Sequence, residues 1–340
     1  MGLKFGFLFS IRNPRRWEKP WPQVYGEMLE QVEAAEDLGF DSVWMSEHHG
    51  AEDGYCPSTL VAAAAAAART SRITIGVRLL LLPLHHPVRV AEDAAVVDNL
   101  AHGRFVLGVA VGYVPHEYGM FGVNRRHRPS LLEEGVEIIK RCWTEERFDY
   151  QGKRFSLQGV AVQPKPFQKP HPPIWLGGMR GKALDRVARL GDGFHFVGTT
   201  EVYAKYAAAM RRHGRDPRSI PVYDSREFWM AEEAAQAWQE AREHLFYSYS
   251  TYAAWGAAAD AADGRPTTDV PGTTPEEMRQ RTGTMLFIGN PEEIVALFKQ
   301  RLEAVPLTGT IMRVPPGMEH RQVLRCMELV AQEVMPHFVD

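Results

Sequence analysis

The chain has 340 residues, with 39 Lys and Arg residues against 42 Asp and Glu residues, and a formal net charge of −3. This balance gives no electrostatic reason to expect binding to nucleic acid or to an anionic membrane. The most apolar runs, 61–68 and 79–84, are too short to cross a bilayer. The three cysteines are far apart and have neither disulfide nor zinc spacing, as expected for a reducing compartment. We therefore expect a cytoplasmic protein.

Strand-like segments alternate with helical patterns along the whole chain. We predict strands over 3–10, 41–46, 72–82, 104–112, 173–178, 192–198, 221–230 and 309–314. The run 73–77 lacks polar alternation, as parallel strands covered on both faces do. Eight such units predict a (β/α)8 TIM barrel of the α/β class. A doubly wound open sheet is the alternative, but no Gly-x-Gly-x-x-Gly motif follows the first strand.

Three connections are longer than a bare barrel needs, namely 12–23, 145–172 and 253–284. We expect a single domain over 1–340, with these insertions as long loops at the C-terminal face. The second contains a hairpin-like pattern at 148–155. The third is rich in Ala, Gly, Thr, Asp and Pro, so we expect a mobile segment after a helix at 232–249, which becomes ordered only with ligand.

Glu47, His48 and His49 follow directly after the second predicted strand. The carboxyl ends of barrel strands carry the active sites of TIM-barrel enzymes, and histidine transfers protons near neutral pH. A purely structural role, capping the strand by hydrogen bonds, is the alternative. A metal site is disfavoured because adjacent strand residues point to opposite faces, and a third ligand with suitable spacing is not evident. We therefore predict proton transfer or ligand binding, and no metal.

Two further segments are candidates for a binding site. His85 and His86 follow the third strand, although His86 is equally explained as the cap of a helix that begins at Pro87. The run 177–182 leads from a strand through two glycines into a helix, and it carries Arg180 and Lys182. Free helix N–H groups and glycines are typical of a phosphate cradle, but a turn that needs glycine would look the same.

A longer series of motifs resembles the bacterial luciferase-like monooxygenase family. These motifs are 39–49, 82–83 with 86–89 and 91–93, 103–105 with Gly108, 121–122, 289–293 and 334–336. They keep their order from the first strand to the last helix. The resemblance implies a barrel that binds FMN, or the related coenzyme F420, at the carboxyl face.

The resemblance also implies an activity. Family members take reduced FMN from a separate flavin reductase, react it with O2 to a C4a-peroxyflavin and oxygenate a small organic molecule. An F420-dependent dehydrogenase or reductase of the same family is the alternative, and a non-catalytic flavin-binding barrel is a third. A homodimer is expected from the family, and the alanine-rich helix at 61–68 would allow close packing.

Site residues follow from the matching positions. His48 is expected to be catalytic and to contact the flavin, beside a non-prolyl cis peptide placed at Arg78–Leu79. Further cofactor contacts are expected from Gly108, Ala110, Gly112, Gly178, Met179, Arg180 and Gly198. The luciferase catalytic subunit has a reactive cysteine and a phosphate-binding arginine where Ala110 and Val111 stand here, so light emission is not expected. Arg180 could replace the missing charge.

The substrate pocket is predicted on weaker grounds. Aromatic residues in the long loops and after the fourth strand suggest a mostly apolar organic substrate. The residues assigned to it are Trp17, Tyr113, His116 and Tyr150.

Overall fold

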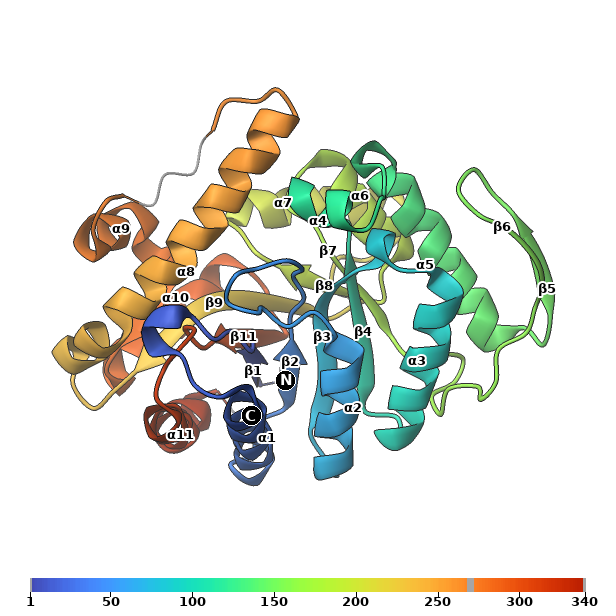
Figure 1. Cartoon of the computed structure of the whole chain (residues 1–340). Coiled ribbons are helices and arrows are strands. Elements are labelled where there is room, and N and C mark those ends of the chain that lie inside the picture. Colours follow the sequence, from blue (N-terminus) through green and yellow to red (C-terminus); the bar gives the residue numbers. More distant parts are fainter. Residues whose placement is uncertain (1, 268–271, 339–340) are drawn as a thin grey trace.

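The computed structural model describes residues 2–267 and 272–338. It is a closed barrel of parallel strands surrounded by helices (Figure 1). In order around the barrel the strands are β1 (Lys4–Phe9), β2 (Ser42–Met45), β3 (Thr74–Leu81), β4 (Phe105–Ala110), β7 (Ile174–Gly177), β8 (Gly193–Phe196), β9 (Val222–Met230) and β11 (Gly309–Arg313). β11 pairs with β1 and closes the ring. This confirms the predicted TIM barrel, and each of these eight strands lies inside its predicted range.

The helices lie outside the barrel. They are α1 (Trp21–Asp37), α2 (Thr59–Arg69), α3 (Pro87–Leu100), α4 (Pro115–Met120), α5 (Arg128–Thr144), α6 (Gly181–Leu190), α7 (Thr200–Arg212), α8 (Ala234–Ala262), α9 (Pro275–Thr282), α10 (Pro291–Ala304) and α11 (His320–Leu329). The start of α10 shows why they begin where they do, since Pro291 fits the first turn and Asn290 and Glu293 form a capping box. Within residues 2–267 and 272–338, no helix is long and apolar enough to span a bilayer.

Large aromatic side chains fill the barrel interior opposite glycines. A Cβ atom on Gly76 would lie 2.1 Å from the Trp44 ring, and one on Gly193 would lie 2.4 Å from the Trp175 ring. Only glycine therefore fits at these strand positions, and the rings occupy the space instead. Because the interior is packed, a ligand must bind at the carboxyl ends of the strands.

A ninth strand, β10 (Leu286–Gly289), was not expected. Strand β9 has two neighbours on this side. Its first part, Val222–Asp224, pairs with β8, and its last part, Glu227–Met230, pairs with β10. Four apolar residues in front of a helix give too short a pattern to identify a strand. A hairpin does begin at the predicted position, but it is longer than the predicted 148–155, because β5 (Phe148–Gln151) pairs antiparallel with β6 (Ser156–Val160).

The expectation of a mobile segment at 253–284 was wrong for most of its length. Helix α8 continues without a break to Ala262, and α9 covers 275–282. Residues 268–271 of the segment lie outside the described residues. The alanines of 253–262, which suggested mobility, are the strongest helix formers, and Tyr252 and Trp255 give this part of α8 a surface to pack on.

Candidate active site

His48 and Glu117 form a buried pair at the carboxyl end of β2. His48 Nδ1 lies 2.8 Å from Glu117 Oε1, which also accepts the backbone N–H of His49 at 3.0 Å. Glu117 belongs to the short helix α4 and is fully buried. A carboxylate at Nδ1 holds a proton there and leaves Nε2 as the nitrogen that can serve a ligand. The sequence analysis did not single out Glu117, because only the fold brings α4 over β2.

Aromatic rings surround the His48 imidazole. Ring centroids of Trp255, Tyr55 and Tyr252 lie 4.5, 4.8 and 5.9 Å from the His48 centroid, and Tyr113 lies at 6.2 Å. Tyr252 and Trp255 come from α8, and Trp255 belongs to the segment that was expected to be mobile, so this segment covers part of the site. The tyrosine hydroxyls stay satisfied, since Tyr55 and Tyr252 are hydrogen-bonded to each other at 2.8 Å. His48 is only 8% exposed, and the site is shielded from water.

Glu47 is the centre of a second buried cluster. Its Oε1 atom lies 2.9 Å from His49 Nε2 and 2.8 Å from His85 Nε2, and Thr59 Oγ1 donates to Oε2 at 3.2 Å. Burial raises the pKa of Glu47, but the bonds from His49 and His85 outweigh it and lower the pKa to about 2. His85 supplies the third potential ligand atom, which the spacing in the sequence did not reveal. The ligand atoms of Glu47, His49 and His85 lie within 4.8 Å of one another, close enough to hold an ion.

The region around Arg78 and Leu79 combines several expected cofactor contacts. The Arg78–Leu79 peptide is cis, at the bond where it was predicted. A Cβ atom on Gly108 would lie 2.1 Å from the Val77 carbonyl oxygen, and Leu79 lies over Gly177. Ala110 pairs with β3 at Leu81. The neighbouring Gly112 has φ 66°, a conformation that glycine adopts without strain.

The turn between β7 and α6 is the predicted phosphate cradle. A Cβ atom on Gly178 would lie 3.0 Å from the Ala183 backbone, so glycine allows this close approach without any shift of the neighbouring helix. Gly181 begins α6, and Arg180 in front of it makes no side-chain cap. Met179 is 52% exposed. The turn can therefore accept an anion at the helix N-terminus.

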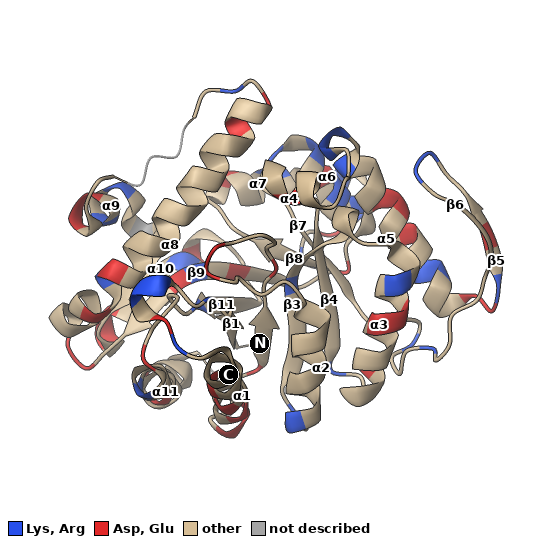
Figure 2. Cartoon of the chain, viewed as in Figure 1, with Lys and Arg blue, Asp and Glu red and all other residues tan. Residues whose placement is uncertain are grey.

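Basic residues near this turn were missed in the sequence. Figure 2 shows Lys and Arg on α6 and at the start of the adjoining helix α5. Arg186 Nη1 lies 3.7 Å from Glu133, and burial lowers the Arg186 pKa, with Arg128 also contributing. Arg125 and Arg128 share one carboxylate, Asp263. The run 125–128 was the signal that could have revealed these cations.

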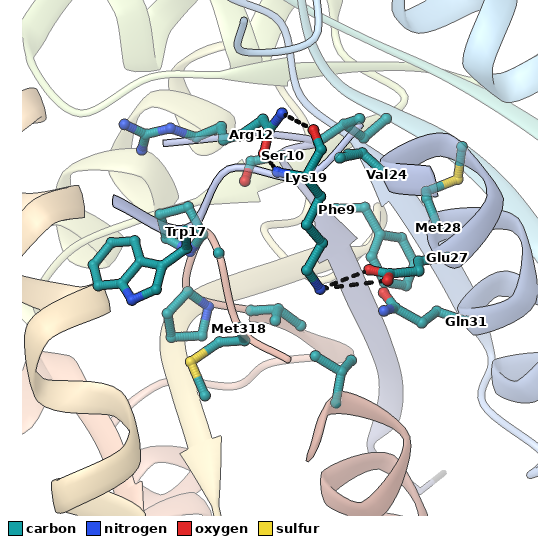
Figure 3. A pocket seen from close by; sticks show the side chains of 17 residues that line it. Phe9, Ser10, Arg12, Trp17, Lys19, Val24, Glu27, Met28, Gln31 and Met318 are labelled. Carbon is teal, nitrogen blue, oxygen red and sulfur yellow. Dashed lines mark hydrogen bonds and ion pairs between the residues drawn. The ribbon is translucent and has the colours of Figure 1, made fainter. Parts of the chain in front are cut away.

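Two of the predicted substrate residues lie near His48. Tyr113 is within ring contact, and His116 Nε2 lies 2.9 Å from the His49 carbonyl oxygen. Trp17 instead stacks on His244 at 3.9 Å and lines a cavity beside Lys19 and the start of α1 (Figure 3).

Two other predicted residues lie elsewhere. Tyr150 is on the β5–β6 hairpin at the outer edge of the barrel, where its hydroxyl donates to Glu137 at 3.2 Å. Gly198 follows the carboxyl end of β8, where its carbonyl oxygen accepts hydrogen bonds from Arg226 at 3.2 Å and from Arg301 of α10 at 2.7 Å. The structure therefore does not bring Tyr150 or Gly198 into contact with the residues around His48.

The fold and the site agree with a known family. The family model described as "Luciferase-like monooxygenase" matches residues 3–308, so the chain belongs to the luciferase-like monooxygenase family. An uncharacterized protein of Sinorhizobium fredii is 30% identical over 63% of each chain, and a second one from the same strain is matched over only 55% of its length. The oxygenase component of flavin-dependent trigonelline monooxygenase from Acinetobacter baylyi is 25% identical over 94% of this chain and 91% of its own.

Solved structures share the fold over the whole chain. Monooxygenase RslO1 from Streptomyces bottropensis has a TM-score of 0.84, 24% identity and coverage of 98% and 99% of the two chains. The oxygenating constituent of 3,6-diketocamphane monooxygenase from Pseudomonas putida, in complex with FMN, has a TM-score of 0.81, 19% identity and coverage of 100% and 99%. An F420-dependent secondary alcohol dehydrogenase has a TM-score of 0.76, 19% identity and full coverage of both chains.

Proposed function

We propose that the protein is a flavin-dependent monooxygenase that uses reduced FMN and O2 to oxygenate a small organic substrate. The observation that carries this proposal is the His48–Glu117 pair, buried beneath an aromatic cover at the carboxyl end of the barrel. Membership of the luciferase-like monooxygenase family and the likeness to an FMN-bound structure support it.

The residues present fit a flavin. Buried polar atoms without hydrogen-bond partners include Arg78 Nε, Glu117 Oε2 and both ring nitrogens of His195, which suit a ligand with hydrogen-bonding edges. Reduced FMN would supply the oxygen-activating chemistry when bound. The residues that would hold its ring are His48, Arg78, Leu79, Gly108, Ala110 and Gly112, and those for its phosphate are Gly178, Met179, Arg180, Arg128 and Arg186.

His48 would hold or move a proton at Nε2. Glu117 orients the imidazole through Nδ1 and stabilises it when it is protonated. Trp255 and Tyr252 exclude water, and Tyr113 and His116 would face the substrate. Water exclusion strengthens each of these electrostatic interactions.

The test is an anaerobic titration with reduced FMN and, in parallel, reduced F420, followed by addition of O2. The proposal predicts that the wild-type protein binds reduced FMN tightly and releases H2O2 slowly after O2 is added. It also predicts that His48→Ala releases H2O2 at least several-fold faster. Unchanged H2O2 release in that variant would remove His48 from the mechanism. Flavin binding without reaction in either arm would identify a non-catalytic barrel.

The second candidate is an F420-dependent dehydrogenase or reductase. Arg180 at the start of α6, Arg186 further along that helix and Arg128 at the start of α5 favour it, because F420 carries a longer acidic tail than FMN. Binding of F420 much tighter than that of FMN would decide for this function.

Assembly and location complete the proposal. A separate flavin reductase would supply the reduced cofactor, as the term oxygenase component implies for the trigonelline enzyme. A homodimer is supported by exposed apolar side chains on neighbouring helices, with Val61 of α2 72% exposed and Val96 and Leu100 of α3 45% exposed. Solution scattering that gives a monomer would contradict it. Three free, buried cysteines fit a reducing cytoplasm.

A further inference from the structure

Arg78 is a buried cation with no hydrogen-bond or ion-pair partner among the residues that the structure describes. It is only 8% exposed, and its Nε atom has no hydrogen-bond partner. Among residues 2–267 and 272–338, no carboxylate lies within ion-pair distance of its guanidinium group. Two residues earlier on the same strand face, Gly76 contacts Trp44 in the barrel interior, so Arg78 also points inward, above the packed aromatic rings.

Two other arginines near this end of the barrel each pair with a carboxylate. Arg12 Nε lies 2.6 Å from Asp53, and Arg313 Nη2 lies 3.2 Å from Glu227. Asp224 is not in contact with Arg78 but binds Arg226 at 2.9 Å and Arg301 at 2.7 Å, so it acts on Arg78 only from a distance. Arg78 therefore lacks a carboxylate of its own within the described part of the chain.

An unpaired buried charge is costly, and its retention at a ligand site calls for a ligand of opposite charge. Burial, followed by repulsion from Arg313, lowers the Arg78 pKa to about 10, so the group stays charged at neutral pH. His195 beside it is different. Burial lowers the His195 pKa well below its ordinary value, which keeps the ring neutral, and neither ring nitrogen has a hydrogen-bond partner.

We propose that Arg78 binds a planar organic anion, with neutral His195 as a second hydrogen-bonding group beneath it. The planar guanidinium fork matches a delocalised oxyanion and binds it through two parallel hydrogen bonds. This inference rests on the proposed function, within which the anion has two possible sources. One is a carboxylate or enolate on the substrate, and the other is the negatively charged ring edge of reduced flavin, near N1. Either one changes the expectation of a mostly apolar pocket.

The test compares matched pairs of charged and neutral probes by calorimetry. Wild-type protein, Arg78→Met, Arg78→Lys and the surface control Arg325→Met are titrated with oxidised FMN, anaerobic reduced FMN, benzoate and benzamide. Arg78→Met should weaken one anion about 10-fold or more, while its neutral counterpart changes less than about 2-fold. Arg78→Lys should retain part of the preference, and Arg325→Met should retain all of it.

The pattern of loss identifies the source. A selective loss of reduced FMN assigns Arg78 to the flavin, and a selective loss of benzoate assigns it to a substrate anion. If Arg78→Met does not fold, the wild-type protein still tests the proposal through two ratios of binding affinity, that of benzoate over benzamide and that of reduced over oxidised FMN. Affinity ratios near 1 for both pairs would overturn the proposal. Wild-type protein that binds no flavin would refute the proposed function, while the benzoate pair would still report on Arg78.

Discussion

His48 Nδ1 and Glu117 Oε1 lie 2.8 Å apart although the two residues are 69 positions apart in the sequence. Glu117 is fully buried, and its second oxygen has no hydrogen-bond partner within residues 2–267 and 272–338. The pair therefore fixes the orientation of the imidazole and leaves a buried acceptor next to the proposed flavin site.

The Glu117 carboxylate is predicted to hold the Nδ1–H form of His48. Glu117→Gln should remove this preference and lower the rate of the proposed reaction about 10²-fold. Nitrogen NMR of protein with labelled histidine would show Nδ1 protonated in the wild type and a mixture of tautomers in the variant. The same tautomer in both proteins would contradict an orienting role for Glu117.

The part of α8 that follows Tyr249 is predicted to protect His48 from solvent. Trp255→Ala removes the ring 4.5 Å from the His48 imidazole and should increase the rate of His48 modification by diethyl pyrocarbonate several-fold. Peptide mass spectrometry measures that rate. Trp238→Ala is the matched control on the same helix, because Trp238 packs under Arg279 instead. Equal acceleration by both variants would indicate general loosening of α8.

Glu47 should stabilise the fold in a pH-dependent manner. Its pKa is lowered from 4.5 to about 2 in the folded protein. The stabilisation is therefore complete above pH 4.5 and is lost as the pH falls towards 2, with a total of about 3 kcal/mol. Urea unfolding should show that the stability difference between wild type and Glu47→Gln shrinks over this range. Exposed Glu146→Gln should stay within about 0.5 kcal/mol throughout.

The basic residues near α6 are predicted to bind the FMN phosphate. Arg186→Met should weaken FMN binding about 10-fold and leave riboflavin, which lacks the phosphate, unchanged. Fluorescence titration with both flavins measures this. Arg189→Met is the control, because Arg189 lies on the same helix and binds the same Glu133 carboxylate, at 2.6 Å. Equal losses for FMN and riboflavin would place Arg186 away from the phosphate.

Gly108 is predicted to tolerate no side chain. A Cβ atom there would lie 2.1 Å from a backbone oxygen and 2.8 Å from His195 Nε2, so Gly108→Ala should cost about 1–3 kcal/mol of stability. Gly119→Ala should instead increase the stability, because Gly119 is in helix α4 and nothing lies within 4 Å of its Cβ position. Melting temperatures of the two variants decide the question. A wild-type melting temperature for Gly108→Ala would show that β3 and β8 adjust.

The sequence by itself was enough to predict the barrel, because the eight βα repeats are local patterns of apolar strands and capped helices. It also located Glu47, His48 and His49, since polar residues directly after an apolar strand are conspicuous. The sequence also contained the information needed to predict the length of α8. The high helix propensity of its alanines indicates a helix, but the Gly and Asp residues among them were given more weight.

Only the tertiary structure decided which groups meet. Glu117, His85, Trp255 and the unpaired charge of Arg78 depend on contacts between segments tens to hundreds of positions apart, and such contacts leave no periodic signal in the chain. Tyr150 is a residue that the sequence placed at the site and the structure does not. Aromatic residues in long loops also pack against the outside of the barrel, and the sequence does not distinguish the two positions. Strand register and barrel closure determine which side chains become neighbours across the barrel. The ion pairs and hydrogen bonds at the site therefore follow from the fold and not from the local sequence.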